Sequence, residues 1–131
     1  MGVKRPISPF LTVYKPEITS VFSIFERITG LVLVGALFFG VILLKLESML
    51  LSQYWCYSLC YAIFKGSLGS LFTGTLLLFV LLCTVYHTVF GARYIYWERA
   101  VSQLTIESIK ETTLPMLGGV IAITLVIWLL I

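Results

Sequence analysis

Charged residues are scarce in this chain of 131 residues. Lys, Arg, Asp and Glu together make up 11% of it, and all six acidic residues are glutamates. A soluble domain of this length carries about 25% charged residues. Hydrophobic residues make up 60% instead, and the mean hydropathy is +1.05. The composition excludes an ordinary soluble domain and predicts a single membrane domain.

Cysteine motifs and cofactor-binding motifs are also lacking. Cys56, Cys60 and Cys83 form no C-x-x-C pair, so neither a disulfide framework nor a zinc site is predicted. No cysteine set suits an iron–sulfur cluster, and no flavin or dinucleotide motif is present. The net charge of +3 comes from scattered basic residues, so no nucleic-acid binding is expected. We therefore expect no autonomous catalysis and assign no catalytic residue.

The first residues lack the apolar run of a signal peptide beside their basic residues. Residues 1–19 carry Pro6, Pro9 and Pro16, which predict an extended N-terminal arm. Residues 20–131 are predicted to form a three-span membrane anchor domain in an all-α bundle.

Three apolar runs are each near the ~20 residues that a helix needs to cross a bilayer. They cover about residues 21–44, 67–90 and 114–131, and Pro115 is expected to open the third. Between the first two lie aromatic residues suited to a membrane interface, on a short interfacial helix. These are Tyr54, Trp55, Tyr57 and Tyr61. The charged segment 91–113 is predicted to be a solvated connection.

The distribution of basic residues predicts the orientation of the spans. Three spans place the start of the chain and the segment 91–113 on one side, with seven basic residues, and residues 45–66 on the other, with two. The positive-inside rule then places the N-terminus in the cytoplasm or the mitochondrial matrix.

A polar cluster stands at the start of the first span. Ser23 and Arg27 are four residues apart and share a helical face, with Glu26 beside them. One interpretation is topogenic: Arg27 anchors the helix end and Glu26 pairs with it or with solvent. The other is a polar pocket that binds a ligand carbonyl or an anion through hydroxyl and guanidinium donors.

His87, the single histidine, lies about one turn before the predicted end of the second span. Cys83 and Gly91 are its i−4 and i+4 neighbours, and such small groups leave room for a flat ligand. Two interpretations stay open: a hydrogen bond to another helix, or axial ligation of a haem iron. One histidine cannot supply both axial ligands, so a haem would require a second membrane subunit or a second copy.

Three stretches together resemble the family of succinate dehydrogenase cytochrome b subunits, the larger membrane anchors of respiratory complex II. The family opens with R-P-x-S-P-H-L-x-x-Y, and this chain reads RPISPFLTVY over residues 5–14. The next family pattern is S-I-x-H-R-x-T/S-G, against SIFERITG over residues 23–30. The last is H-x-x-x-G-I-R-H-L-x-W-D, against HTVFGARYIYWE over residues 87–98.

The resemblance implies an electron-transfer role in succinate:ubiquinone oxidoreductase. The partners would be a flavoprotein subunit, an iron–sulfur subunit and a small membrane anchor, in the lipid bilayer. The residues matching Ser23 and Arg27 line the ubiquinone pocket of the family. The one matching His87 is an axial ligand of a b-type haem shared with the small anchor, and those matching Arg27 and Arg93 lie near its propionates.

This chain departs from the family patterns at several histidines. Phe10, Glu26 and Tyr94 stand where the family has histidine, and Glu98 replaces aspartate. An inward carboxylate at position 26 would repel a haem propionate, so we expect Glu26 to pair with Arg27 or with a cation of a partner. The alternative function is a structural scaffold subunit without haem. The mitochondrial inner membrane is the expected location, with the N-terminus on the matrix side; a bacterial plasma membrane is the alternative.

Overall fold

The chain forms three long helices and one short 3-10 helix in the part that the structure describes. The structure is a computed structural model that describes residues 13–48, 55, 58, 61, 62 and 65–131. Most of the predicted N-terminal arm, together with Tyr54 and Tyr57, lies outside these residues. The predicted all-α class is confirmed. The elements are α1 (Ile18–Ser48), α3 (Ser67–Arg99), η2 (Val101–Gln103) and α4 (Ile106–Leu130).

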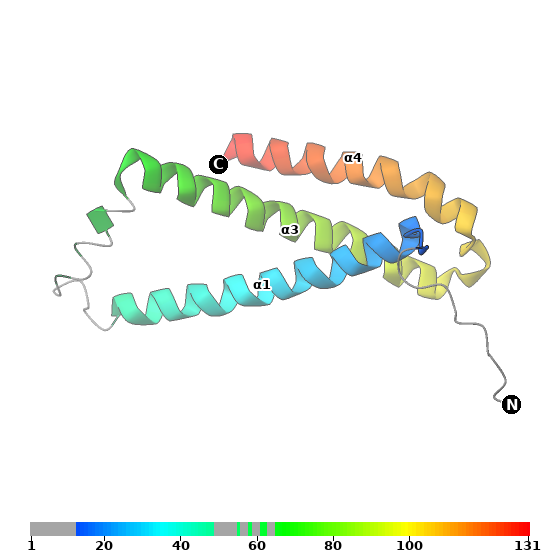
Figure 1. Ribbon diagram of the computed structural model, residues 1–131, viewed down its shortest axis with the longest axis horizontal. Coiled ribbons are helices and arrows are strands. Elements are labelled where there is room, and N and C mark those ends of the chain that lie inside the picture. The colour runs from blue at the N-terminus through cyan, green and yellow to red at the C-terminus, as the bar shows by residue number, and fades with distance from the viewer. Residues whose placement is uncertain (1–12, 49–54, 56–57, 59–60, 63–64) are drawn as a thin grey trace, which may run out of the picture.

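Helix α3 is the centre of the bundle. It runs antiparallel to α1 on one side and to α4 on the other, whereas α1 and α4 contact each other much less (Figure 1). The three helices lie close together where α1 begins, α3 ends and α4 begins. Toward the other end, α1 diverges from α3 (Figure 1). Residues placed at the close end therefore have neighbours from all three helices.

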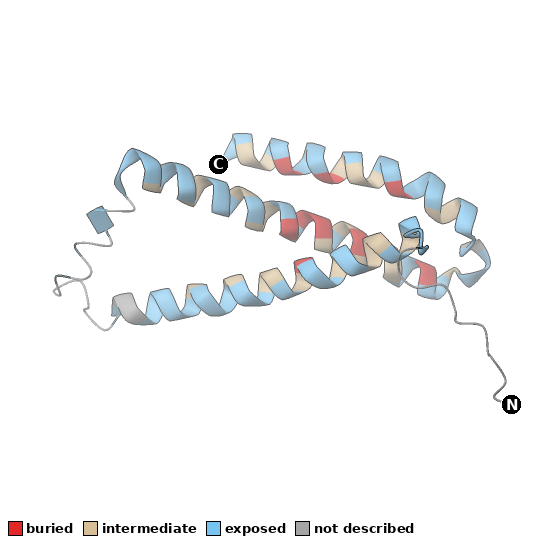
Figure 2. Ribbon diagram, in the orientation of Figure 1, coloured by how far each residue is buried: buried red, intermediate tan, exposed pale blue. Residues whose placement is uncertain are grey.

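Buried residues extend from this close end along α3 and α4 into the middle of the bundle (Figure 2). The core is built on Tyr86 and Phe90 of α3, Val120 of α4 and, partly buried, Phe22 of α1. The Phe90 ring stacks on Phe22 at 5.4 Å and on Tyr86 at 4.4 Å between centroids. Most other large apolar side chains face outward, as a lipid environment allows. All three helices are long and apolar enough to cross a membrane, which confirms the predicted transmembrane architecture.

Two helix ends differ from the predicted spans. Helix α3 continues past Phe90 to Arg99, because Arg93 and Trp97 are buried on its inner face instead of being solvated. Helix α4 begins at Ile106, where the Thr105 side chain accepts a hydrogen bond of 3.2 Å from the Ser108 amide. Pro115 consequently lies inside α4 instead of opening it. Most of the segment predicted as a solvated connection is helical.

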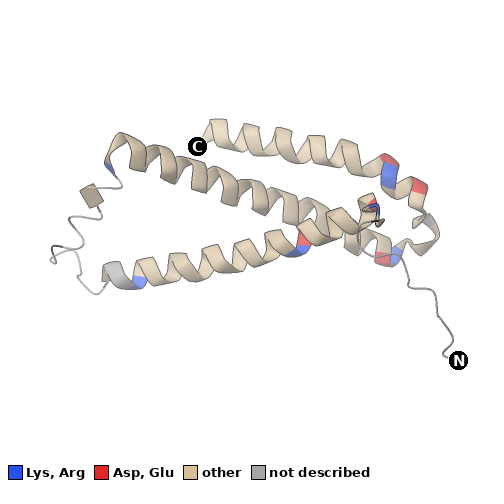
Figure 3. Cartoon of the chain, in the orientation of Figure 1, with Lys and Arg blue, Asp and Glu red and all other residues tan. Residues whose placement is uncertain are grey.

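Charged residues lie near the helix ends, with one clear exception (Figure 3). Glu26 and Arg27 lie within α1, about 12 Å along the axis from Ile18 at about 1.5 Å per residue. The described residues of the predicted aromatic interface, Trp55 and Tyr61, are exposed. Lys65 lies 5.1 Å from the centre of the Tyr61 ring.

Candidate functional site

The His87 imidazole of α3 lies against α1 at a glycine. A methyl group at Gly30 would come within 3.0 Å of the His87 Cε1 atom. This is shorter than a comfortable carbon–carbon contact, so Gly30 allows the close approach of the ring to the α1 backbone. The histidine side chain keeps 42% of its surface exposed. The Nδ1–Cε1 edge of the ring lies against α1, while much of the rest is exposed.

Oxygen atoms of α1 surround one nitrogen of the ring. His87 Nδ1 lies 3.1 Å from the Glu26 carbonyl oxygen, 3.1 Å from Glu26 Oε1 and 3.3 Å from Thr29 Oγ1. The Thr29 hydroxyl donates its own hydrogen to the Glu26 carbonyl at 2.9 Å. All three oxygens therefore act as acceptors toward the ring. We assign the proton to Nδ1, which leaves the lone pair of the neutral imidazole on Nε2.

The Nε2 atom of His87 has no hydrogen-bond partner within the described part of the chain. A histidine that binds a metal characteristically donates its other ring N–H to a carbonyl or carboxylate. The arrangement at His87 has this form, so the residues fit a histidine that would hold a haem iron through Nε2. The described residues contain no group of three or more His, Cys, Asp and Glu side chains suited to a metal ion.

Glu26 turns into the α1–α3 contact. Its carboxylate side chain is 14% exposed, and Oε1 bonds His87 while the buried Oε2 has no partner in the described chain. A methyl group at Gly91 would come within 3.3 Å of Oε1, so a second glycine leaves room for the carboxylate. The expected pairing of Glu26 with Arg27 is not found, because the carboxylate faces His87 and Arg27 is exposed. Pairing with a cation of a partner stays a prediction.

Arg93 closes the contact between α3 and α4. Its Nη1 donates to Thr113 Oγ1 at 2.9 Å, and Nη2 donates to the Ile109 carbonyl at 3.4 Å. The guanidinium lies 4.0 Å from the centre of the Trp97 ring. The buried Nε atom has no partner in the described chain. The guanidinium faces α4, whereas His87 faces α1, so the structure does not bring these two predicted haem-binding residues together.

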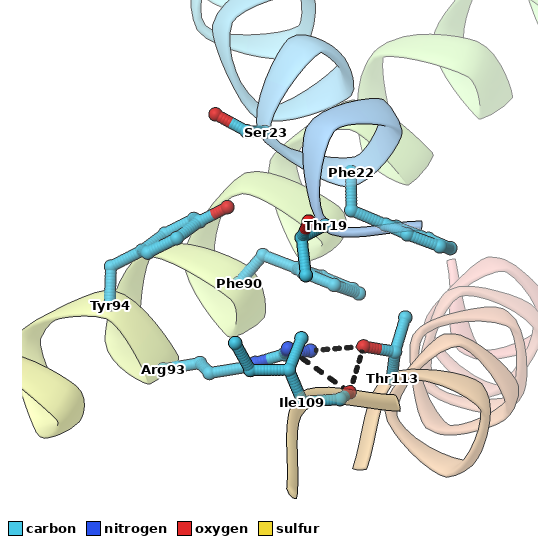
Figure 4. A pocket seen from close by; sticks show the side chains of 8 residues that line it. All are labelled: Thr19, Phe22, Ser23, Phe90, Arg93, Tyr94, Ile109 and Thr113. Carbon is cyan, nitrogen blue, oxygen red and sulfur yellow. Dashed lines mark hydrogen bonds between the residues drawn. The ribbon is translucent and has the colours of Figure 1, made fainter. Parts of the chain in front are cut away.

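Ser23 lines a small cavity of about 120 Å³ at the close end of the bundle. Figure 4 shows the walls: Ser23 and Thr19 come from α1, Arg93 and Tyr94 from α3, and the remaining side chains from all three helices. The Ser23 hydroxyl makes no hydrogen bond within the described residues. Its oxygen is therefore available to a ligand or a partner.

The predicted site residues thus fall into separate groups. Ser23 and Arg93 line one cavity, and His87 joins Glu26 at another contact. Arg27 is exposed and lines neither. Sequence reasoning missed two supporting residues. Thr29 stands at the T/S position of the family pattern S-I-x-H-R-x-T/S-G, which could have indicated it, but nothing in the sequence pointed to the buried Thr113.

The fold defines a class: a three-span helical membrane protein whose single histidine lies at a contact between two of the helices. A family model described as succinate dehydrogenase/fumarate reductase transmembrane subunit matches residues 1–127. The chain belongs to this family. The resemblance expected from its sequence stretches is confirmed.

Curated relatives agree with the family match over most of the chain. The succinate dehydrogenase cytochrome b560 subunit of Reclinomonas americana is 41% identical over 130 residues, covering 99% of this chain and 88% of that protein. The cytochrome b560 subunit of Marchantia polymorpha is 38% identical over 98 residues, covering 75% and 70%. The cytochrome b556 subunit of Rickettsia bellii (strain RML369-C) is 30% identical over 128 residues, covering 95% and 91%.

Proposed function

We propose that this chain is a membrane-anchor and electron-transfer subunit of succinate:ubiquinone oxidoreductase, which ligates a b-type haem through His87 and helps to form the ubiquinone site. The family membership and the names of the relatives support the assignment to the complex. The observation that carries the haem assignment is the His87 ring, held at Nδ1 by three acceptors and without a partner at Nε2.

The sequence contains one histidine, so a haem held by His87 would take its other protein ligand from the small membrane anchor. The group, when bound, accepts and releases one electron. Arg27 is exposed and unpaired with Glu26, which leaves its guanidinium available to a propionate. A propionate contact by Arg93 stays a prediction, because its two terminal nitrogens already donate to α4.

The proposed ubiquinone site is the cavity at the close end of the bundle. Ser23 supplies a hydroxyl donor in the cavity, and Tyr94 adds a phenol to the same wall. Reduction of a quinone develops negative charge on its oxygens, and fixed donors stabilise that charge. The cavity of about 120 Å³ is small, so we infer that partner subunits complete the site. Arg27 is exposed on α1 and does not line this cavity, so its contact with a quinone stays a prediction.

The distribution of basic residues supports the proposed partners and orientation. The flavoprotein and iron–sulfur subunits would dock at the close end, where basic residues outnumber those at the other end. This end would face the mitochondrial matrix, or the cytoplasm if the membrane is a bacterial plasma membrane. Activity belongs to the assembled complex, because this chain offers no flavin or iron–sulfur motif.

The function is tested by isolating the complex through a tag on this chain in mild detergent. The expected result is electron transfer from succinate to a soluble quinone, sensitive to quinone-site inhibitors. An isolated complex that contains neither flavoprotein nor iron–sulfur subunit and lacks this activity would overturn the proposal. Succinate oxidation by an artificial dye, measured in parallel, reports the soluble subunits independently of the quinone site.

A structural scaffold subunit without haem is the second candidate. It is favoured by one observation: His87 is already hydrogen-bonded to α1, as a purely structural histidine would be. The two candidates differ in the reduced-minus-oxidised absorption spectrum of the isolated complex. A scaffold predicts active soluble subunits with no b-type bands, whereas haem ligation predicts such bands.

A further inference from the structure

The Glu26 carboxylate is not needed to hold the His87 ring in place, because two other oxygens of α1 already face Nδ1. The backbone carbonyl of Glu26 and the Thr29 hydroxyl already face Nδ1, at 3.1 and 3.3 Å, and are enough to fix the tautomer and the ring plane. The carboxylate adds a third acceptor at 3.1 Å. It differs from the other two because it carries a charge in its ionised form.

That charge is not balanced by a cation in the described part of the chain. The ion-pair contact of Glu26 is with His87 itself, Arg27 is exposed, and Oε2 is buried without a partner. Burial of an ionisable group with no such partner is costly. A neutral side chain would be the cheaper choice if packing were the only requirement, and the glycines at 30 and 91 leave space for the present arrangement.

We propose that Glu26 is a positioning residue for the haem ligand: its carboxylate accepts the Nδ1 proton of His87 in a charge-assisted hydrogen bond and thereby lowers the midpoint potential of the haem. This rests on the proposed ligation of haem by His87. A carboxylate bonded to the ring N–H raises the basicity of the ligating nitrogen. The more basic ligand and the nearby negative charge both stabilise the oxidised iron, which carries the larger positive charge.

Glu26→Gln isolates the charge, because the amide has nearly the same shape and its oxygen also accepts a hydrogen bond. The backbone carbonyl and Thr29 remain to hold the ring. A charge-assisted hydrogen bond is roughly twice as strong as a neutral one. We therefore expect the ratio of reduced to oxidised haem at a fixed potential to rise about tenfold, equal to about 59 mV for one electron.

The experiment is a potentiometric titration of the haem absorbance in the isolated complex, for the wild type, Glu26→Gln, Glu26→Asp and Glu107→Gln. Glu107 lies exposed in the first turn of α4 and controls for the loss of a distant negative charge. The expected result is a raised potential in Glu26→Gln, a potential nearer the wild type in Glu26→Asp, and no change in Glu107→Gln. Succinate oxidation by dye confirms that each complex has assembled.

Each other outcome is decisive. A b-type haem whose potential is the same in Glu26→Gln as in the wild type would overturn the inference while leaving His87 ligation intact. An equal shift in Glu107→Gln would also overturn it. A wild-type complex that contains no haem would overturn the proposed ligation, and this inference with it. If Glu26→Gln assembles without haem, retention of haem by Glu26→Asp supports the carboxylate, whereas loss from both contradicts the role of its charge.

Discussion

Two of the polar contacts that helix α3 makes within the described residues differ in character. Toward α1, His87 meets Glu26 and Thr29 beside a glycine, its side chain is 42% exposed, and Nε2 has no partner in the described chain. Toward α4, Arg93 is buried, donates to Thr113 and Ile109, and lies against the Trp97 ring.

The difference separates a contact that is open to a ligand from one that holds helices together. At His87 the protein fixes one nitrogen and leaves the other available, which is the arrangement a metal ligand needs. At Arg93 the terminal nitrogens are committed within the chain. Polar residues inside a membrane helix are functional candidates by default, but the contacts around each one decide which role it has.

The largest effect is expected at the contact between His87 and α1. His87→Ala removes the proposed axial ligand, and we expect complete loss of the b-type bands from the reduced-minus-oxidised spectrum. Thr88→Ala is the matched control, because Thr88 is exposed and bonds only its own helix at the Thr84 carbonyl. An unchanged spectrum in His87→Ala would remove the ligand assignment.

Arg93→Ala removes the polar contact between α3 and α4. The loss of the cation–π contact with Trp97 and of the bond to Thr113 should destabilise the subunit by about 3 kcal/mol. The measurement is the thermal unfolding midpoint of the isolated complex, with exposed Arg99→Ala as the control. The b-type bands should survive in complexes that remain assembled. Loss of haem without loss of stability would show that Arg93 serves the haem instead.

Ser23→Ala tests the cavity that Ser23 and Arg93 line. Removing one hydroxyl donor costs about 1 kcal/mol, so the KM for quinone should rise about fivefold. Dye reduction by succinate should not change. Ser20→Ala is the control, since Ser20 is exposed on α1 and does not line the cavity. A parallel fall of both activities would indicate that Ser23 supports assembly.

Gly30→Ala gives the smallest expected effect and tests how closely the His87 ring must approach α1. The added methyl group meets His87 Cε1 at 3.0 Å, so the ring must move by a few tenths of an ångström. We expect haem to be retained with a shifted absorption maximum. Gly35→Ala gains the same helix propensity, about 1 kcal/mol, but has no neighbour within 4 Å. The same spectrum in both variants would mean that Gly30 does not set the ring position.

Hydrophobic runs predicted the three helices well, because length and apolar composition alone decide what can cross a bilayer. Their ends were predicted less well. Arg93 and Glu107 read as members of a solvated connection, yet both are helical. Arg93 is buried through a tertiary contact with Thr113 of the next helix, which no local pattern in the sequence shows.

The same limit applies to the candidate site. Spacing correctly identified His87 as a residue in a span with small neighbours, and the sequence stretches correctly indicated the family. The inward turn of Glu26 was not predicted, because it depends on the room that Gly91 leaves across the helix contact. Ser23 and Arg27 share a helical face by spacing, but only Ser23 lines the cavity, since the neighbouring helix covers a single part of that face.

The most direct measurement is the absorption spectrum of the wild-type complex, isolated through this chain and reduced with succinate. We predict b-type bands that appear when succinate is added, because electrons from the soluble subunits would reach the haem held by His87. A complex that contains flavin and iron–sulfur clusters, oxidises succinate and shows no b-type bands even with a strong chemical reductant would contradict haem ligation and leave the scaffold function.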